Sequence, residues 1–193
     1  HGLATAYYLA KQHGVTRIAV LEKGWIGGGN TGRNTTMVRS DYMFPESAAI
    51  YDLGLPLYEG LAKEINFNIM LSQRGWMTLI HDQHQMETAH HKINWMHCHG
   101  IDGEFVDRQT VKRMLPHLSI DGNPRFPVLG AFLQKRGGTV RHDAVAWGYA
   151  RAADRLGVDI IENCEVLGFE RQGDGISAIN TSRGRIKTDT IGV

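Results

Sequence analysis

The sequence predicts an α/β fold that contains a parallel β-sheet, and three of its stretches indicate this fold. Residues 2–12 have apolar side chains at helical spacing and are followed by Gly14, which is typical of a helix C-terminus. Residues 17–22 form a short, mostly apolar run, as expected of a strand buried in a parallel sheet. A second helical pattern over 143–156 is followed by another apolar run at 158–161. Helices and strands that alternate at these lengths are typical of α/β proteins.

The first helix and strand fit the second half of a dinucleotide-binding βαβ unit. Gly2 occupies the place of the last glycine in a G-x-G-x-x-G turn, where a bare Cα lets the helix pack closely on the sheet. Glu22 ends the following strand, where a carboxylate accepts hydrogen bonds from an adenosine ribose. The alternative is an ordinary helix–strand pair with a surface glutamate. The spacing favours a flavin or nicotinamide enzyme.

Composition narrows the class of protein. A net charge of +1 gives no electrostatic reason to bind nucleic acid or an anionic membrane. The two cysteines, Cys98 and Cys164, form no C-x-x-C pair, which argues against a disulfide framework and favours a reducing cytoplasm. No apolar run is long enough for a transmembrane helix. Because the glycine motif lacks its first half and residues 185–193 read as a strand with nothing after it, we expect a fragment of a larger protein.

The remaining chain predicts mixed helices and strands. Asp107 is expected to cap a short helix, and Pro56 is expected to kink a longer one. Helices are expected over 46–65, 83–97 and 108–115, and strands over 74–81, 127–133, 164–170, 175–179 and 184–188. Residues 68–135 mix predicted strands and helices in a pattern that differs from both ends of the chain. We therefore assign 1–67 and 136–193 to a nucleotide-binding domain and 68–135 to part of an inserted, substrate-facing α+β domain.

A glycine-rich loop over 24–32 follows Glu22 directly. Glycines permit close backbone approach, and their exposed amides can cradle a pyrophosphate. Asn30 and Thr35 add neutral hydrogen-bonding groups, and Arg33 and Arg39 add positive charge. Taken alone, the loop is equally well explained as a surface connection. Its place directly after Glu22 favours contact with a cofactor.

His142 lies near the N-terminus of the predicted helix over 143–156. The helix dipole there disfavours the imidazolium form, an effect that Arg141 reinforces and Asp143 opposes. A neutral imidazole can attack an electrophile, although a capping or surface histidine is the better interpretation without further context. Six other histidines, together with Cys98, match no zinc spacing, and a solvated helix face explains them better: His81, His84, His90, His91, His97 and His99. No metal site is predicted.

Four stretches together resemble one family. They are HGLATAYYLAKQHG, VLEKGWIGGGNTGRNTTMVRSDY, SQRGWMTL and GGTVRHDAVAWGYARAADRLGVDIIENCEVLGF. The sequence is similar to the β subunits of heterotetrameric sarcosine oxidases, which are flavin-dependent amine oxidoreductases related to D-amino-acid oxidase. The likeness runs along almost the whole chain and covers about the first half of such a subunit.

The resemblance implies an FAD-binding, Rossmann-like parallel sheet with part of an inserted α+β substrate domain. It implies noncovalent FAD and covalent FMN, with sarcosine oxidised at the FAD and electrons passed through the FMN to oxygen, which yields hydrogen peroxide. It further implies alpha, gamma and delta partner subunits, transfer of a one-carbon unit to tetrahydrofolate in a partner subunit, and a cytoplasmic location.

The resemblance also assigns site residues. The FAD contacts would be His1, Gly2, Glu22, Asn30, Thr35, Met37 and Val166, and His142 would carry the FMN on its 8α-methyl carbon. The early loop contains no histidine or cysteine, which favours noncovalent FAD and the oxidase over related dehydrogenases. Most substrate-positioning residues are expected beyond residue 193, and Arg39 and Arg74 are candidates to face an anion. Two alternatives remain open: a single-flavin amine or amino-acid oxidase or dehydrogenase, and a non-catalytic flavoprotein scaffold subunit.

Overall fold

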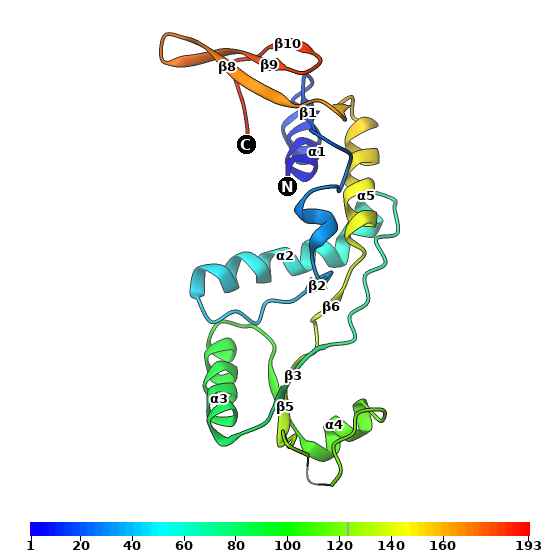
Figure 1. The fold of residues 1–193 in the computed structure, drawn as a ribbon, viewed down its shortest axis with the longest axis vertical. Helices are drawn as coiled ribbons and strands as arrows, with labels where there is room; N and C mark the ends of the chain where they lie inside the picture. The colour runs from blue at the N-terminus through cyan, green and yellow to red at the C-terminus, as the bar shows by residue number, and fades with distance from the viewer. Residues whose placement is uncertain (123) are drawn as a thin grey trace. The chain divides into compact units, whose positions relative to one another are not determined.

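The computed structural model describes residues 1–122 and 124–193, and Figure 1 shows the order of the helices and strands. The chain divides into two compact units. The first comprises His1–Thr35, Ala62–Ile69 and Arg141–Val193, and the second comprises Thr36–Leu61 and Met70–Val140. Each unit is therefore assembled from segments that are far apart in the sequence.

The first unit contains a parallel strand pair next to two helices. Strand β1 (Ala19–Leu21) pairs in parallel with β7 (Asp159–Ile161), which confirms the predicted parallel sheet. Helix α1 (Gly2–His13) precedes β1 and ends at Gly14, whose φ is 64°. Helix α5 (His142–Asp154) precedes β7 and packs against α1. The predicted helix–strand alternation is thus confirmed at both ends of the chain.

Two smaller features complete the first unit. A 3-10 turn, η1 (Asn30–Arg33), lies in the glycine-rich loop. Strands β8 (Val166–Gln172), β9 (Gly175–Thr181) and β10 (Gly184–Lys187) form the antiparallel meander coloured orange to red in Figure 1. The meander confirms the strands expected in this part of the chain.

A carboxylate joins α1 to the end of α2 (Pro45–Glu64) within the first unit. Glu64 accepts hydrogen bonds from Tyr7 Oη at 3.3 Å, Tyr8 Oη at 3.4 Å and Lys11 Nζ at 2.8 Å. The hydrogen bond to Glu64 raises the pKa of Lys11. Tyr149 of α5 meets the Tyr7 ring edge to face at 5.7 Å, so aromatic contacts add to this polar cluster.

The second unit is built on an antiparallel sheet in the order β3 (Trp76–Ile80), β5 (Gly130–Gln134), β4 (Glu104–Asp107). All five residues of the central strand β5 are buried. Side chains alternate between the two faces of a strand, so β5 has a core on each side. Phe132 packs in a cluster with residues of α3 (Gln83–Cys98), and Leu133 packs in a second cluster with Val111 of α4 (Arg108–Met114). Figure 1 shows α3 and α4 on opposite sides of this sheet.

Short strands β2 (Met37–Val38) and β6 (Gly138–Thr139) form a separate antiparallel pair in the second unit. As expected, Asp107 caps α4 by accepting a hydrogen bond from Thr110 N at 2.7 Å. Helix α2 runs through Pro56 without interruption. Strand β4 was not predicted, because it is short and forms through pairing with β5 rather than through an apolar pattern of its own.

The structure corrects one expectation about packing. A Cβ atom added to Gly2 would lie 4.0 Å from Val20 Cγ1, which is an ordinary van der Waals contact. Close packing of α1 on β1 therefore does not require glycine at this position.

Among the described residues, no helix combines the length and the apolar character needed to cross a bilayer.

Gly138→Ala is expected to destabilise the second unit. A Cβ at Gly138 would overlap the carbonyl oxygen of Ser72 and lie 2.8 Å from Gln73 Cα. Ser72 and Thr139 exchange two backbone hydrogen bonds at 2.8 and 3.0 Å, so the backbones cannot separate without losing them. We expect a loss of about 2–3 kcal/mol in the free energy of unfolding, measured by denaturant titration. Gly60→Ala is the control, because its Cβ meets nothing within 4 Å. An equal loss in both variants would contradict the prediction.

Candidate functional site

The candidate site begins where strand β1 ends. Glu22 N donates to Ile161 O at 2.9 Å, and Glu22 O accepts from Cys164 N at 2.9 Å. A further backbone bond joins Asn163 N to Gly24 O at 2.8 Å. These bonds extend the parallel pairing beyond β1 and β7 and fix the backbone of Glu22. Ligands of open α/β sheets bind at the carboxyl ends of parallel strands, which is where Glu22 lies.

The Glu22 carboxylate is half-buried and only partly engaged. Its Oε1 atom accepts a hydrogen bond from Gly24 N at 2.7 Å. Its other oxygen has no hydrogen-bond partner among the described residues. Nearby, Glu162 Oε1 accepts from Ile26 N at 2.7 Å, and Lys23 pairs with Glu165 at 2.6 Å. Each of these three carboxylates is held through one oxygen, and Glu22 is the one that stands at the carboxyl end of β1.

Val166 lies close to the same strand end. It opens β8, two residues after Cys164, whose backbone bonds to Glu22. Glu165 and Ser182 exchange bonds on the adjacent turn, with Glu165 N donating to Ser182 Oγ at 3.0 Å. Val166 is half-exposed. The structure therefore brings Glu22 and Val166 together, although they are far apart in the sequence.

The glycine-rich loop folds against α5. Gly28 N donates to Trp25 O at 2.9 Å, and Gly27 adopts a φ of 82° that favours glycine. A Cβ at Gly32 would lie 2.6 Å from Gly27 O, so the two ends of the loop touch through their backbones. A Cβ at Gly27 would lie 4.0 Å from the Cβ of Ala146 in α5. The loop is thus a packed turn, and it contacts the helix that begins at His142.

The other predicted FAD residues lie at exposed positions. His1 precedes α1, where its carbonyl accepts from Thr5 N at 2.9 Å, and its side chain makes no cap. Asn30 and Thr35 have exposed side chains in and just after η1. Met37 is exposed and belongs to the second unit, in β2. Seven of the eight predicted site residues lie in the first unit.

His142 is the first residue of α5, and its ring nitrogen Nδ1 is buried without a hydrogen-bond partner among the described residues. On either side, Arg141 and Asp143 form a two-point ion pair with distances of 3.0 and 2.7 Å. Hydrogen bonding to Arg141 lowers the pKa of Asp143. The charges of these two neighbours are therefore paired with each other at the N-terminus of α5.

Two of the other histidines, His97 and His99, contact backbone carbonyls through a ring nitrogen. His97 Nε2 contacts Gly103 O at 2.7 Å, and His99 Nδ1 contacts Trp95 O at 2.8 Å. Within residues 1–122 and 124–193, no three His, Cys, Asp or Glu side chains are grouped to hold a metal ion. These ring nitrogens bond backbone carbonyls at the end of α3, where they satisfy the local chain.

The two candidate anion-facing arginines occupy different surroundings in the second unit. The Arg39 guanidinium lies 4.8 Å from the ring centroids of both Tyr42 and Trp76. Its Nη1 pairs at 2.5 Å with buried Asp41, which also pairs with Lys92 at 2.6 Å. Arg74 instead lines a shallow depression of about 320 Å³. Arg39 is therefore a fixed cation in a cluster of two positive charges and one negative charge.

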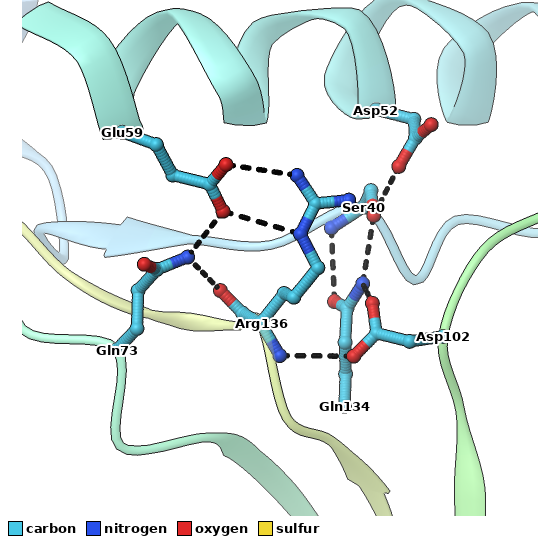
Figure 2. A network of polar contacts seen from close by, with 7 residues as sticks. All are labelled: Ser40, Asp52, Glu59, Gln73, Asp102, Gln134 and Arg136. Atoms are coloured by element: carbon cyan, nitrogen blue, oxygen red, sulfur yellow. Dashed lines mark hydrogen bonds and ion pairs between the residues drawn. The ribbon is translucent and has the colours of Figure 1, made fainter.

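A polar network includes Ser40, the residue after Arg39, and was not predicted from the sequence (Figure 2). Gln134, at the end of β5, bonds Ser40 and Asp102. Asp102 Oδ2 accepts from Arg136 N at 2.9 Å, and the Arg136 side chain forms a two-point pair with Glu59 of α2 at 3.1 Å. The one available signal was a lone polar residue, Gln134, in the apolar strand sequence GAFLQ.

Comparison with known proteins assigns the family. The whole chain, residues 1–193, matches the family model described as FAD dependent oxidoreductase. The chain belongs to this family of FAD-dependent oxidoreductases. Its parallel strand pair, with Glu22 at the carboxyl end, agrees with that assignment.

Individual relatives of this FAD-dependent oxidoreductase are similar over most of its length. It is 55% identical over 186 residues to "Sarcosine oxidase subunit beta" of Rhizobium meliloti (strain 1021), which covers 96% of this chain and 44% of that protein. It is 49% identical to the protein of the same name from Rhodobacter capsulatus, with 96% and 45% covered. The structure of L-proline dehydrogenase from P. horikoshii matches with a TM-score of 0.87 and 24% identity, over 97% of this chain and 48% of that one. The chain spans about half the length of the curated relatives it matches.

Glu59→Gln is expected to reduce stability at neutral pH but not in acid. Hydrogen bonds from Arg136 and Gln73 lower the pKa of Glu59 below its ordinary value of 4.5. A lowered folded-state pKa contributes stability that is present above the unfolded value and is lost as the pH falls through the folded value. Arg136 is 41% exposed, so we expect a loss below about 1 kcal/mol at pH 7. Denaturant titrations at neutral pH and well below pH 4.5 would test this, and a loss that persists unchanged in acid would contradict it.

Proposed function

We propose that this protein is the β subunit of a heterotetrameric sarcosine oxidase, which oxidatively demethylates sarcosine to glycine. The observation that carries the proposal is its 46–55% identity to three proteins named sarcosine oxidase subunit beta. In this proposal the complete protein passes electrons from FAD through FMN to oxygen, yielding hydrogen peroxide. The one-carbon unit passes to tetrahydrofolate in a partner subunit. Alpha, gamma and delta subunits are the proposed partners, in the cytoplasm.

We propose that residues 1–67 and 136–193 belong to the FAD-binding domain and that residues 68–135 belong to the substrate domain. Glu22 would accept hydrogen bonds from the adenosine ribose through the carboxylate oxygen that Gly24 leaves available. Backbone groups at Val166 would meet the adenine end. The remaining proposed contacts to noncovalent FAD are His1, Gly2, Asn30, Thr35 and Met37. When bound, the flavin supplies the redox chemistry that these side chains lack.

His142 is the proposed attachment point of the FMN. A buried ring nitrogen without a partner is costly to fold, and a covalent bond or a ligand hydrogen bond would satisfy it. Bond formation requires an unprotonated imidazole nitrogen as the nucleophile, and the charges of Arg141 and Asp143 next to it are paired with each other. The orphaned Nδ1 thus fits the covalent assignment.

Arg39 is the proposed contact for the carboxylate of sarcosine. Two aromatic rings and Asp41 hold its guanidinium, so little side-chain entropy would be lost on binding. Asp41 is shared with Lys92, which leaves one net positive charge in the cluster. A held guanidinium with residual positive charge is suited to a carboxylate.

Glu22→Gln is expected to weaken FAD binding by roughly tenfold or more, because a charge-assisted hydrogen bond to the ribose is lost while the Gly24 N bond can remain. The measurement is the dissociation constant of FAD from the complete protein, followed by flavin fluorescence. Glu165→Gln is the matched control, since that carboxylate pairs with Lys23 at the surface of the same turn. Unchanged affinity in Glu22→Gln would remove Glu22 from the FAD site.

Mass spectrometry of the denatured, digested complete protein tests the FMN assignment. We expect an FMN adduct on the peptide containing His142, absent in His142→Ala and retained in the exposed-residue control His84→Ala. An unmodified His142 peptide from protein that still releases FAD would overturn the two-flavin proposal and favour a single-flavin amine oxidase. Bound flavin that sarcosine does not reduce would indicate a scaffold subunit.

A further inference from the structure

Gln134 is a fully buried amide at the end of an otherwise apolar strand. An amide without partners in such a place would destabilise the fold, yet here its hydrogen-bonding groups are used. Its Oε1 accepts from Ser40 N at 3.0 Å, and its Nε2 donates to Ser40 Oγ at 2.7 Å and to Asp102 Oδ1 at 3.1 Å. The network allows one orientation of the amide, because Oε1 faces a donor and Nε2 faces a carboxylate.

Ser40 is consequently fixed through every polar group it has. Besides the two bonds to Gln134, its Oγ donates to Asp52 Oδ1 at 3.3 Å and its carbonyl accepts from Tyr42 N at 2.9 Å. Figure 2 shows the Gln134 amide next to both Ser40 and Asp102, with Asp52 on the far side of Ser40. The side chain of Gln134 therefore holds the backbone of Ser40, 94 residues away along the chain.

The residues on either side of Ser40 form the cationic cluster. Arg39 and Asp41 pair with each other, and Lys92 pairs with Asp41 from α3. Trp76, which covers one face of the Arg39 guanidinium, lies opposite Gln134 in the β3–β5 register. One position of the ladder thus supplies both the amide that fixes Ser40 and the indole that supports Arg39.

The Gln134 amide is also held by its hydrogen bond to Asp102. Asp102 accepts from Gln134 with one oxygen and from Arg136 N with the other, at 2.9 Å. Arg136 is held by Glu59, and Gln73 bonds both Glu59 Oε1 at 2.7 Å and Arg136 O at 2.9 Å. Gln134 cannot shift without breaking bonds on both sides.

We propose that Gln134 is a positioning residue that fixes the Arg39–Asp41 segment, and with it β2 and Met37, for binding of the substrate carboxylate and the flavin. This inference rests on the proposed function for the identity of the substrate. Gln134 acts through Ser40 and touches neither ligand. Its loss should change substrate affinity rather than merely the amount of folded protein.

The test compares three variants of the complete protein, coexpressed with its partner subunits. Gln134→Leu removes the whole amide, and Ser40→Ala removes one hydroxyl while keeping the Gln134–Ser40 N bond. Val111→Ala is the matched control, because Val111 is fully buried in the same unit but packs in the cluster beside α4. Each variant is measured for thermal stability, KM and kcat with sarcosine, the dissociation constant of FAD, and the flavin absorption spectrum.

We expect Gln134→Leu to raise KM by about tenfold and Ser40→Ala by about threefold, in line with the loss of buried hydrogen bonds. Val111→Ala should lower thermal stability and leave KM unchanged, because partial unfolding reduces only the concentration of active enzyme. If Gln134→Leu does not fold, the KM of Ser40→Ala alone tests the positioning role. Unchanged KM in the folded variants, with stability lowered as in Val111→Ala, would overturn the positioning role.

A different set of results is expected if the proposed function is wrong. If sarcosine neither reduces the wild-type flavin nor turns over, the substrate assignment fails, and the FAD readouts then decide the role of Gln134. Weaker FAD binding and a shifted flavin spectrum in Gln134→Leu, but not in Val111→Ala, would support positioning through the segment that contains Met37. FAD affinity and spectrum equal to wild type would overturn it.

Discussion

Two backbone hydrogen bonds at Glu22 fix how the end of β1 meets the segment that leads from β7 to β8. Glu22 N donates to Ile161 O and Glu22 O accepts from Cys164 N, so both bonds join the end of β1 to the end of β7 and the residues that follow it. Because both use main-chain atoms, they set the register in which the turn after Glu22 and the start of β8 meet. The carboxylate of Glu22 and the backbone at Val166 therefore lie at one strand end. A shift of one residue would turn the Glu22 side chain to the opposite face of the strand.

In the second unit, the main constraint is that buried polar groups need hydrogen-bond or charge partners. Its central strand is buried on both faces, so its polar end must find partners inside the protein. Gln134 does so by bonding Ser40 and Asp102, while Asp41 is buried against two cations. A buried carboxylate is tolerated only when it is paired and hydrogen-bonded. Among the described residues of this unit, the buried polar side chains are Ser40, Asp41 and Gln134, and apolar clusters fill the two faces of the sheet.

Local patterns in the sequence predicted most of the regular structure. Apolar spacing, Gly14 and the Asp107 cap define α1 and α4, because these signals act within one or two turns of helix. Strand β4 was missed because its formation depends on β5, more than twenty residues away. The expectation that close packing of α1 on β1 requires glycine at position 2 was wrong, since motif position alone does not report the distance between helix and strand.

The candidate site was predictable in part. Glu22 and the glycine loop follow a spacing with a physical reason, whereas His142 gained its proposed role from the family resemblance, and its orphaned Nδ1 is visible only in three dimensions. The contact of Ser40 with Gln134 spans 94 residues and leaves no periodic trace in the sequence. Long-range polar contacts of this kind can be recognised only once the fold is known.

The most direct measurement is an anaerobic titration of the complete protein with sarcosine, followed by flavin absorbance. Each sarcosine supplies two electrons, and two flavins together accept four. We expect full bleaching after two equivalents of sarcosine per β subunit. Bleaching that is complete after one equivalent would leave a single redox flavin, and no bleaching by sarcosine would contradict the assignment of the substrate.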